Sequence, residues 1–171
     1  MRSIEGQPRL KRRTPRPSSA DAFSLVELVL VTTIIGIIAA VAVPRYANSL
    51  TRYRAEAAAR RVVADLELAA AQARTTSTLL SVVFDAGADR YQIPGLDHFL
   101  GGSPQGFTIY TVPLSEAPYH AKLLSADFSG DAKLNFNGFG EANASGNVVV
   151  AVGRTKRTVV FDQVSGEATI Q

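Results

Sequence analysis

The sequence predicts an α+β fold: a long N-terminal helix, whose first half crosses a membrane, packs on a mainly antiparallel C-terminal β-sheet. Three observations lead to this prediction. The run Phe23 to Val43 contains no Lys, Arg or Asp. Apolar side chains then recur at intervals of three and four residues, which is typical of one helix face. From Leu79 onward, short β-branched and aromatic runs alternate with turns rich in Gly, Pro, Asn and Asp.

The apolar run is long enough to span a bilayer. A helix over residues 23–43 would extend about 31 Å, close to the hydrocarbon thickness. Its single charge is Glu27. A carboxylate in such a segment costs about 2.5–3.5 kcal/mol on insertion scales, and intramembrane acids usually have a partner. We therefore expect Glu27 to pair with a positive charge.

Residues 1–22 form a basic arm before this run. They hold six basic and two acidic residues and so carry a net charge of +4. Because the whole chain carries +3, residues 23–171 carry a net charge of −1. The pI near 9.4 is thus a property of the arm and not of a nucleic-acid-binding domain. Basic residues before a hydrophobic segment predict a cytoplasmic N-terminus, with the remainder of the chain on the far side.

Two other interpretations of the apolar run stay open. Ala40-Val41-Ala42 fits a signal-peptidase site, which would release an exported domain beginning at Val43. However, the run exceeds the usual 7–15 apolar residues of a signal peptide and contains Glu27. The second interpretation is an uncleaved signal anchor in which Glu27 has no role.

The helix is expected to continue over residues 44–77. Pro44 lacks an N–H and should kink the helix without ending it. Glu56 and Arg60 are spaced for an i,i+4 ion pair, and Asp65 is expected to lie off most of the apolar stripe. That stripe should pack on a sheet and comprises Ala59, Val62, Val63, Leu66, Ala69, Ala70 and Ala73.

Strands are expected throughout residues 78–171. The first two should form a hairpin around the turn at residues 85–89, and the last two a hairpin around residues 163–166. The expected strands are Leu79–Phe84, Arg90–Ile93, Phe107–Val112, His120–Phe128, Lys133–Phe136, Asn147–Val152, Thr158–Asp162 and Glu167–Ile170.

The stretch Ala22-Phe23-Ser24-Leu25-Val26-Glu27 resembles the N-terminus of type IV prepilins and pseudopilins. This resemblance implies that a prepilin peptidase removes residues 1–22 by cutting between Ala22 and Phe23, and that the new amine of Phe23 is N-methylated. It also implies a role for Glu27 in assembly and for Pro44 in bending the helix. The chain departs from the family pattern at Ala22, where a glycine is preferred.

The run Leu66 to Arg74 is similar to a helix of the GspH/FimT group of pseudopilins. The resemblance implies a pilin-like lollipop: a minor pseudopilin of type II secretion, anchored in the bacterial inner membrane by residues 23–43. The β domain would then be periplasmic, and the partners would be the peptidase and other pseudopilins in a helical fibre. The alternative is a FimT-like minor pilin that binds DNA through a basic loop with Arg154, Lys156 and Arg157.

Catalytic and metal-binding patterns are missing from the sequence. There is no cysteine, and His98 and His120 lack a ligand-like spacing. Residues 127–131 fail the calcium-loop pattern, because Ala132 replaces the glycine and Gly138 the bidentate glutamate. We therefore expect no enzyme activity, no metal and no cofactor, and we expect both histidines to lie in loops or at the surface.

Overall fold

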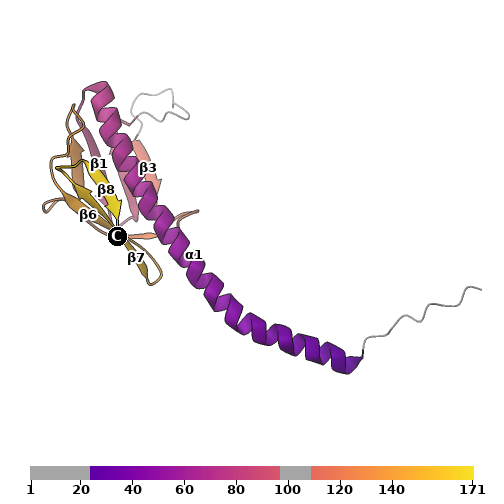
Figure 1. Cartoon of the computed structure of the whole chain (residues 1–171). Helices are drawn as coiled ribbons and strands as arrows, with labels where there is room; N and C mark the ends of the chain where they lie inside the picture. Colours follow the sequence, from indigo (N-terminus) through magenta and orange to yellow (C-terminus); the bar gives the residue numbers. More distant parts are fainter. Residues whose placement is uncertain (1–23, 97–108) are drawn as a thin grey trace, which may run out of the picture. The chain divides into compact units, whose positions relative to one another are not determined.

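The computed structural model describes residues 24–96 and 109–171. It contains one helix, α1 (Leu25–Thr76), followed by eight strands (Figure 1). The chain divides into two compact units between Val41 and Ala42, so α1 contributes to both. The helix continues through Pro44, as expected for a proline that does not end it. The predicted bend at Pro44 remains a prediction.

The strands form two antiparallel sheets of four strands each, where the sequence suggested a single sheet. One sheet has the order β3-β2-β1-β5 and the other the order β4-β6-β7-β8. Their bounds are β1 Leu80–Asp85, β2 Arg90–Pro94, β3 Ile109–Pro113, β4 Lys122–Asp127, β5 Lys133–Phe136, β6 Gly146–Val152, β7 Thr155–Asp162 and β8 Glu167–Ile170. All eight expected strands are present, most with ends shifted by one or two residues.

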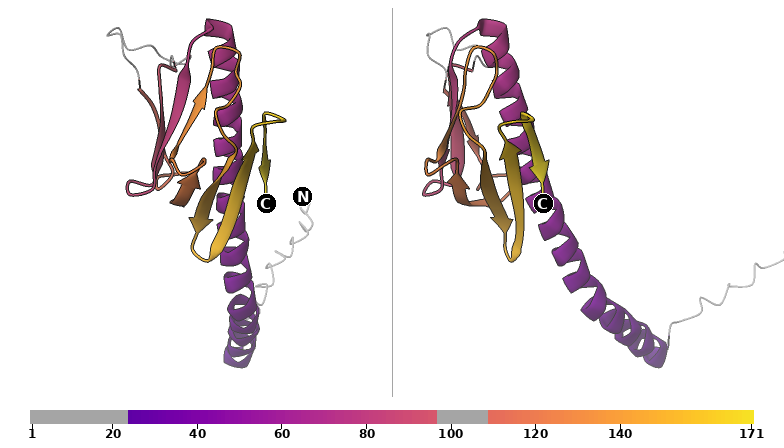
Figure 2. Two further views of the ribbon diagram at one scale, coloured as in Figure 1. Left: turned by 90° about the vertical axis from the view of Figure 1, so that its left-hand side faces the viewer. Right: turned by 60° about the vertical axis from the view of Figure 1, so that its left-hand side comes forward.

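The later part of α1 runs along both sheets, as the two views of Figure 2 show. Its stripe is buried as predicted, together with Ala55 and Ala58, and Val63 is partly buried against the same core. Most of these side chains are alanines, so α1 contributes mainly small side chains to the core. The helix therefore forms one wall of a shared core. Its buried members are Ala55, Ala58, Ala59, Val62, Leu66, Ala69, Ala70 and Ala73.

Aromatic contacts lie within one sheet and between the two. The ring of Phe84 on β1 lies 5.5 Å from that of Tyr91 on the neighbouring strand β2. It also lies 5.6 Å from that of Phe128, which directly follows β4 of the other sheet. Phe136 on β5 meets Phe161 on β7 edge-on at 5.8 Å. Such pairs contribute about 0.5–1.5 kcal/mol each beyond their buried area. Each sheet thus packs on the other as well as on α1.

The loop between β5 and β6 is folded against the end of α1. A Cβ added to Gly140 would lie 2.7 Å from the carbonyl oxygen of Ala70, and Gly140 has a φ of +75°. Asn137 closes the loop, because its side-chain oxygen accepts hydrogen bonds from the amides of Phe139 and Glu141 at 2.9 and 3.0 Å. Only glycine fits the backbone conformation and the close approach at position 140.

Candidate functional site

The first part of α1 is an apolar helix with its side chains exposed. The large residues from Leu25 to Val43 are 44–77% exposed. In the described part, α1 is the one helix long and apolar enough to cross a membrane. Thr32 and Thr33 donate their hydroxyls to the carbonyls of Leu28 and Val29 at 2.9 and 2.7 Å, which satisfies these polar groups within the helix.

Glu27 lies exposed in the first turn of α1. A carboxylate in a first turn interacts favourably with the helix dipole. Within residues 24–96 and 109–171, no ion pair or hydrogen bond reaches the Glu27 side chain. Ala22 and Phe23, the residues of the predicted cleavage site, lie outside the described residues. The counter-charge of Glu27 and cleavage at Phe23 therefore stay predictions.

The basic segment at residues 153–157 differs from the loop that the sequence suggested. Strand β7 begins at Thr155, three residues earlier than predicted, because Thr155 pairs with Val152 of β6 across a two-residue turn. Gly153, with φ +57°, takes the first turn position. Arg154 is exposed in this turn, whereas Lys156 and Arg157 belong to the strand.

Arg157 is also paired. Its Nε lies 2.9 Å from Oε2 of Glu56, and the other oxygen of Glu56 accepts from Nε of Arg60 at 3.1 Å. The predicted i,i+4 pair between Glu56 and Arg60 is thereby confirmed. Hydrogen bonds from Arg157, and then from Arg60, hold the pKa of Glu56 below its ordinary value. Arg157 ties β7 to α1, so the three cations do not form one free cluster.

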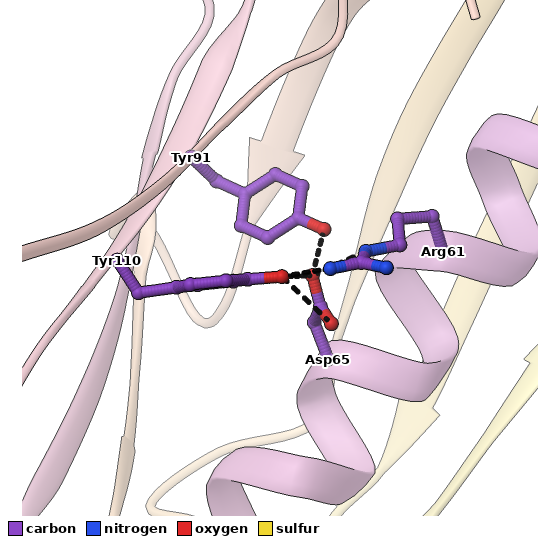
Figure 3. A network of polar contacts seen from close by, with 4 residues as sticks. All are labelled: Arg61, Asp65, Tyr91 and Tyr110. Atoms are coloured by element: carbon purple, nitrogen blue, oxygen red, sulfur yellow. Dashed lines mark hydrogen bonds and ion pairs between the residues drawn. The ribbon is translucent and has the colours of Figure 1, made fainter. Parts of the chain in front are cut away.

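A polar cluster that the sequence did not reveal joins α1 to β2 and β3 (Figure 3). Its centre is Asp65, which is only 3% exposed. Tyr91 donates its hydroxyl to Oδ2 of Asp65 at 2.5 Å, Arg61 donates Nε to the same oxygen at 3.0 Å, and the hydroxyl of Tyr110 lies 3.2 Å away. Arg61 also donates Nη2 to Tyr110. The expectation that Asp65 lies off the buried side of the helix is wrong.

Burial disfavours the charged forms of the residues in this cluster, and their interactions with one another offset part of that cost. Burial raises the pKa of Asp65 above its ordinary value, while hydrogen bonds from Tyr91 and Arg61 act in the opposite direction. The pKa of Tyr91 is raised strongly, first by burial and then by the neighbouring carboxylate. Burial alone would lower the pKa of Arg61, but the charge of Asp65 raises it overall. The hydrogen bonds of this cluster link α1 to β2 and β3.

The two histidines and the segment at residues 127–131 are the other candidate site residues of the sequence. His120 is exposed just before β4, as expected, while His98 lies outside the described residues. The segment at 127–131 is a tight turn in which Asp127 Oδ1 accepts from the amide of Gly130 at 2.7 Å. Among residues 24–96 and 109–171, no group of three His, Cys, Asp or Glu side chains could hold a metal ion.

Comparisons of the chain with protein-family models, with curated proteins and with solved structures gave no match. The architecture is nevertheless pilin-like: a long N-terminal helix that begins apolar and then packs on antiparallel sheets.

Proposed function

We propose that the chain is a minor pseudopilin, a structural subunit of a type II secretion pseudopilus that assembles through its N-terminal helix. One observation carries this proposal: a single acid, Glu27, in an otherwise apolar helical segment, residues 25–43, whose large side chains are exposed. A helix of this kind needs both a lipid or protein environment for its apolar surface and a counter-charge for its carboxylate.

The counter-charge in this proposal is a chain end. A prepilin peptidase cuts between Ala22 and Phe23, and the N-methylated amine of Phe23 becomes a cation about one helical turn from Glu27. A neighbouring subunit, displaced along the fibre, brings its own Phe23 amine to this carboxylate. An ion pair can offset the cost of removing both charges from water, whereas a lone buried carboxylate cannot. The pairing would also fix the stagger between subunits.

The orientation follows from the basic arm. The net charge of +4 before Phe23 holds the N-terminus in the cytoplasm of a bacterial cell, with one span in the inner membrane and the β domain in the periplasm. There the domain would contact neighbouring pseudopilins. The function is therefore assembly, and the chain is the substrate of the peptidase.

The DNA-binding alternative has less support. Arg157 is bound to Glu56, which leaves Arg154 and Lys156 as the exposed cations of that segment. Residues 23–171 carry a net charge of −1. Phosphate binding usually needs a wider basic face, so we favour secretion over DNA uptake.

The first test is the N-terminus of the mature protein. Expression with a prepilin peptidase should give a chain that begins with N-methylated Phe23, as read by mass spectrometry of the N-terminal peptide. A chain that begins at Val43 would show release by signal peptidase, and an intact Met1 would show an uncleaved anchor. Either of these two results would contradict the proposal.

The second test concerns assembly itself. Glu27→Val should still be cut and inserted in the membrane but should fail to co-assemble with partner pseudopilins, as measured by crosslinking and fibre pull-down. Thr33→Val is the matched control, because it also removes a polar group from the same helix but leaves the carboxylate in place. Equal incorporation of the two variants would show that Glu27 does not pair with a neighbouring amine.

A further inference from the structure

The helix residues that directly follow the apolar segment include arginines without partners. Arg45 and Arg52 are exposed, and in the described part of the chain neither side chain makes an ion pair or hydrogen bond. Further along the helix the arrangement differs, since Arg60 is bound to Glu56 and Arg61 to Asp65. Charge is thus left unbalanced in the part of α1 that directly follows the apolar run.

The reason is visible at Glu56. This acid stands four residues after Arg52, at the spacing of a helical ion pair. Both of its oxygens are already taken, Oε1 by Arg60 and Oε2 by Arg157. No Asp or Glu occurs between Glu27 and Glu56. The chain itself therefore offers Arg45 and Arg52 no free carboxylate nearby on the helix.

Two tyrosines share this side of the helix. Tyr46 and Tyr53 are 73% and 72% exposed, although large aromatic side chains are usually covered. They stand seven residues apart, as do Arg45 and Arg52, so each pair repeats to within about 20° around the axis. At about 100° per residue, both tyrosines lie opposite the buried stripe that begins at Ala55. We call Arg45, Tyr46, Ser49, Arg52 and Tyr53 the arginine–tyrosine face.

We propose that the arginine–tyrosine face binds anionic phospholipid headgroups at the membrane surface where the apolar segment ends. Guanidinium groups bind phosphate with two parallel hydrogen bonds, and tyrosines favour the interface because one end of the ring is apolar and the other polar. The position supports a lipid partner, since Arg45 is the second residue after Val43, the last of the apolar run. The face would fix the depth and rotation of the helix in the bilayer.

The inference goes beyond the proposed function. It requires only that the apolar segment enters a bilayer, and it holds whether or not the chain is cut at Phe23 or joins a fibre. Each arginine near an anionic membrane surface should favour the bound state about 5-fold, so two should favour it about 30-fold. Salt should weaken the contact, because it screens exposed charges.

The test uses the full chain in vesicles with a single fluorescent label. The chain has no cysteine, so Ser49→Cys introduces one labelling site in the centre of the face. An environment-sensitive fluorophore at this site should be quenched by spin-labelled lipid in vesicles of phosphatidylcholine with phosphatidylglycerol, and much less in phosphatidylcholine alone. A label at Glu67→Cys, about 27 Å further along the helix, should not respond.

Two charge variants decide between outcomes. Arg45→Gln/Arg52→Gln should lower the ratio of lipid-contacting to water-exposed label by about 30-fold, whereas the control Arg74→Gln/Arg154→Gln removes the same charge elsewhere and should not. Far-UV circular dichroism would verify that each variant folds. The proposal would be overturned if quenching were equal in vesicles with and without phosphatidylglycerol, or if it were unchanged in Arg45→Gln/Arg52→Gln. A response of the label to duplex DNA but not to anionic vesicles would also overturn it, in favour of nucleic acid.

Discussion

The hydroxyl of Tyr91 should be a measurable part of the attachment between α1 and the sheet. It is buried and donates to Oδ2 of Asp65 at 2.5 Å. Hydrogen bonds to charged groups contribute about 1.5–3 kcal/mol. Asp65 would keep Arg61 and Tyr110 as partners in Tyr91→Phe, so the acceptor is not left alone and the lower part of that range applies. We expect a loss of about 1.5–2.5 kcal/mol in the free energy of unfolding.

Thermal unfolding of the full chain in detergent, followed by far-UV circular dichroism, would measure this loss. For a folded unit of this size it corresponds to a fall of about 5–12 °C in Tm. Tyr46→Phe is the matched control, because it removes the same hydroxyl from an exposed ring and should change stability by less than about 0.5 kcal/mol. The reasoning fails if both variants melt alike, or if Tyr91→Phe costs as much in an Asp65→Ala background as in the wild type.

Three further predictions concern charge and backbone. Because burial raises the pKa of Asp65, its protonated form is favoured in the folded state, so its contribution to stability is full at acid pH and is lost as pH rises through the folded pKa. Urea titrations at several pH values would compare the free energy of unfolding of the wild type with that of Asp65→Asn. As pH rises above about 4, the wild type should lose stability relative to the variant. Glu56 is present in both proteins, so its titration does not affect the difference. A flat difference would contradict this. Gly140→Ala should destabilise the fold by clearly more than Gly166→Ala, because both have a positive φ but only Gly140 is crowded, so similar melting temperatures would show that the loop can move away. A double-mutant cycle with Glu56→Gln and Arg157→Gln should give a coupling of about 0.5–1 kcal/mol, and additive effects would show that the bond between α1 and β7 has no net value.

The elements that depend on local sequence could be predicted well. The helix stripe around Val62 and Leu66 follows from 3.6-residue periodicity, and the hairpin turn at 85–89 from its Asp and Gly residues. The division of the strands into two sheets could not be predicted. For example, β1 lies between β2, its neighbour in the chain, and β5, which follows much later, and such non-local pairing leaves no mark in either segment.

The ion pairs show the same limit. Glu56 and Arg157 are 101 residues apart in the sequence, so nothing near Arg157 indicated its partner. The expectation for Asp65 follows the rule that charged side chains face water, and the partners Tyr91 and Arg61 make it an exception. A weak signal existed: Asp65 stands four residues after Arg61 and directly before the buried Leu66, which is the position of a carboxylate held at the edge of a core.

The buried stripe of α1 has a consequence for biogenesis. Residues 55–73 leave the ribosome before any strand, yet they belong to the same buried core as Val159 and Phe161 near the C-terminus. The apolar face of the helix therefore stays uncovered on the nascent chain until almost all of the polypeptide has been synthesised. If residues before Val43 are already held in a bilayer, the exposed helix face stays anchored at the membrane during this time, and a chaperone could bind its alanine-rich turns.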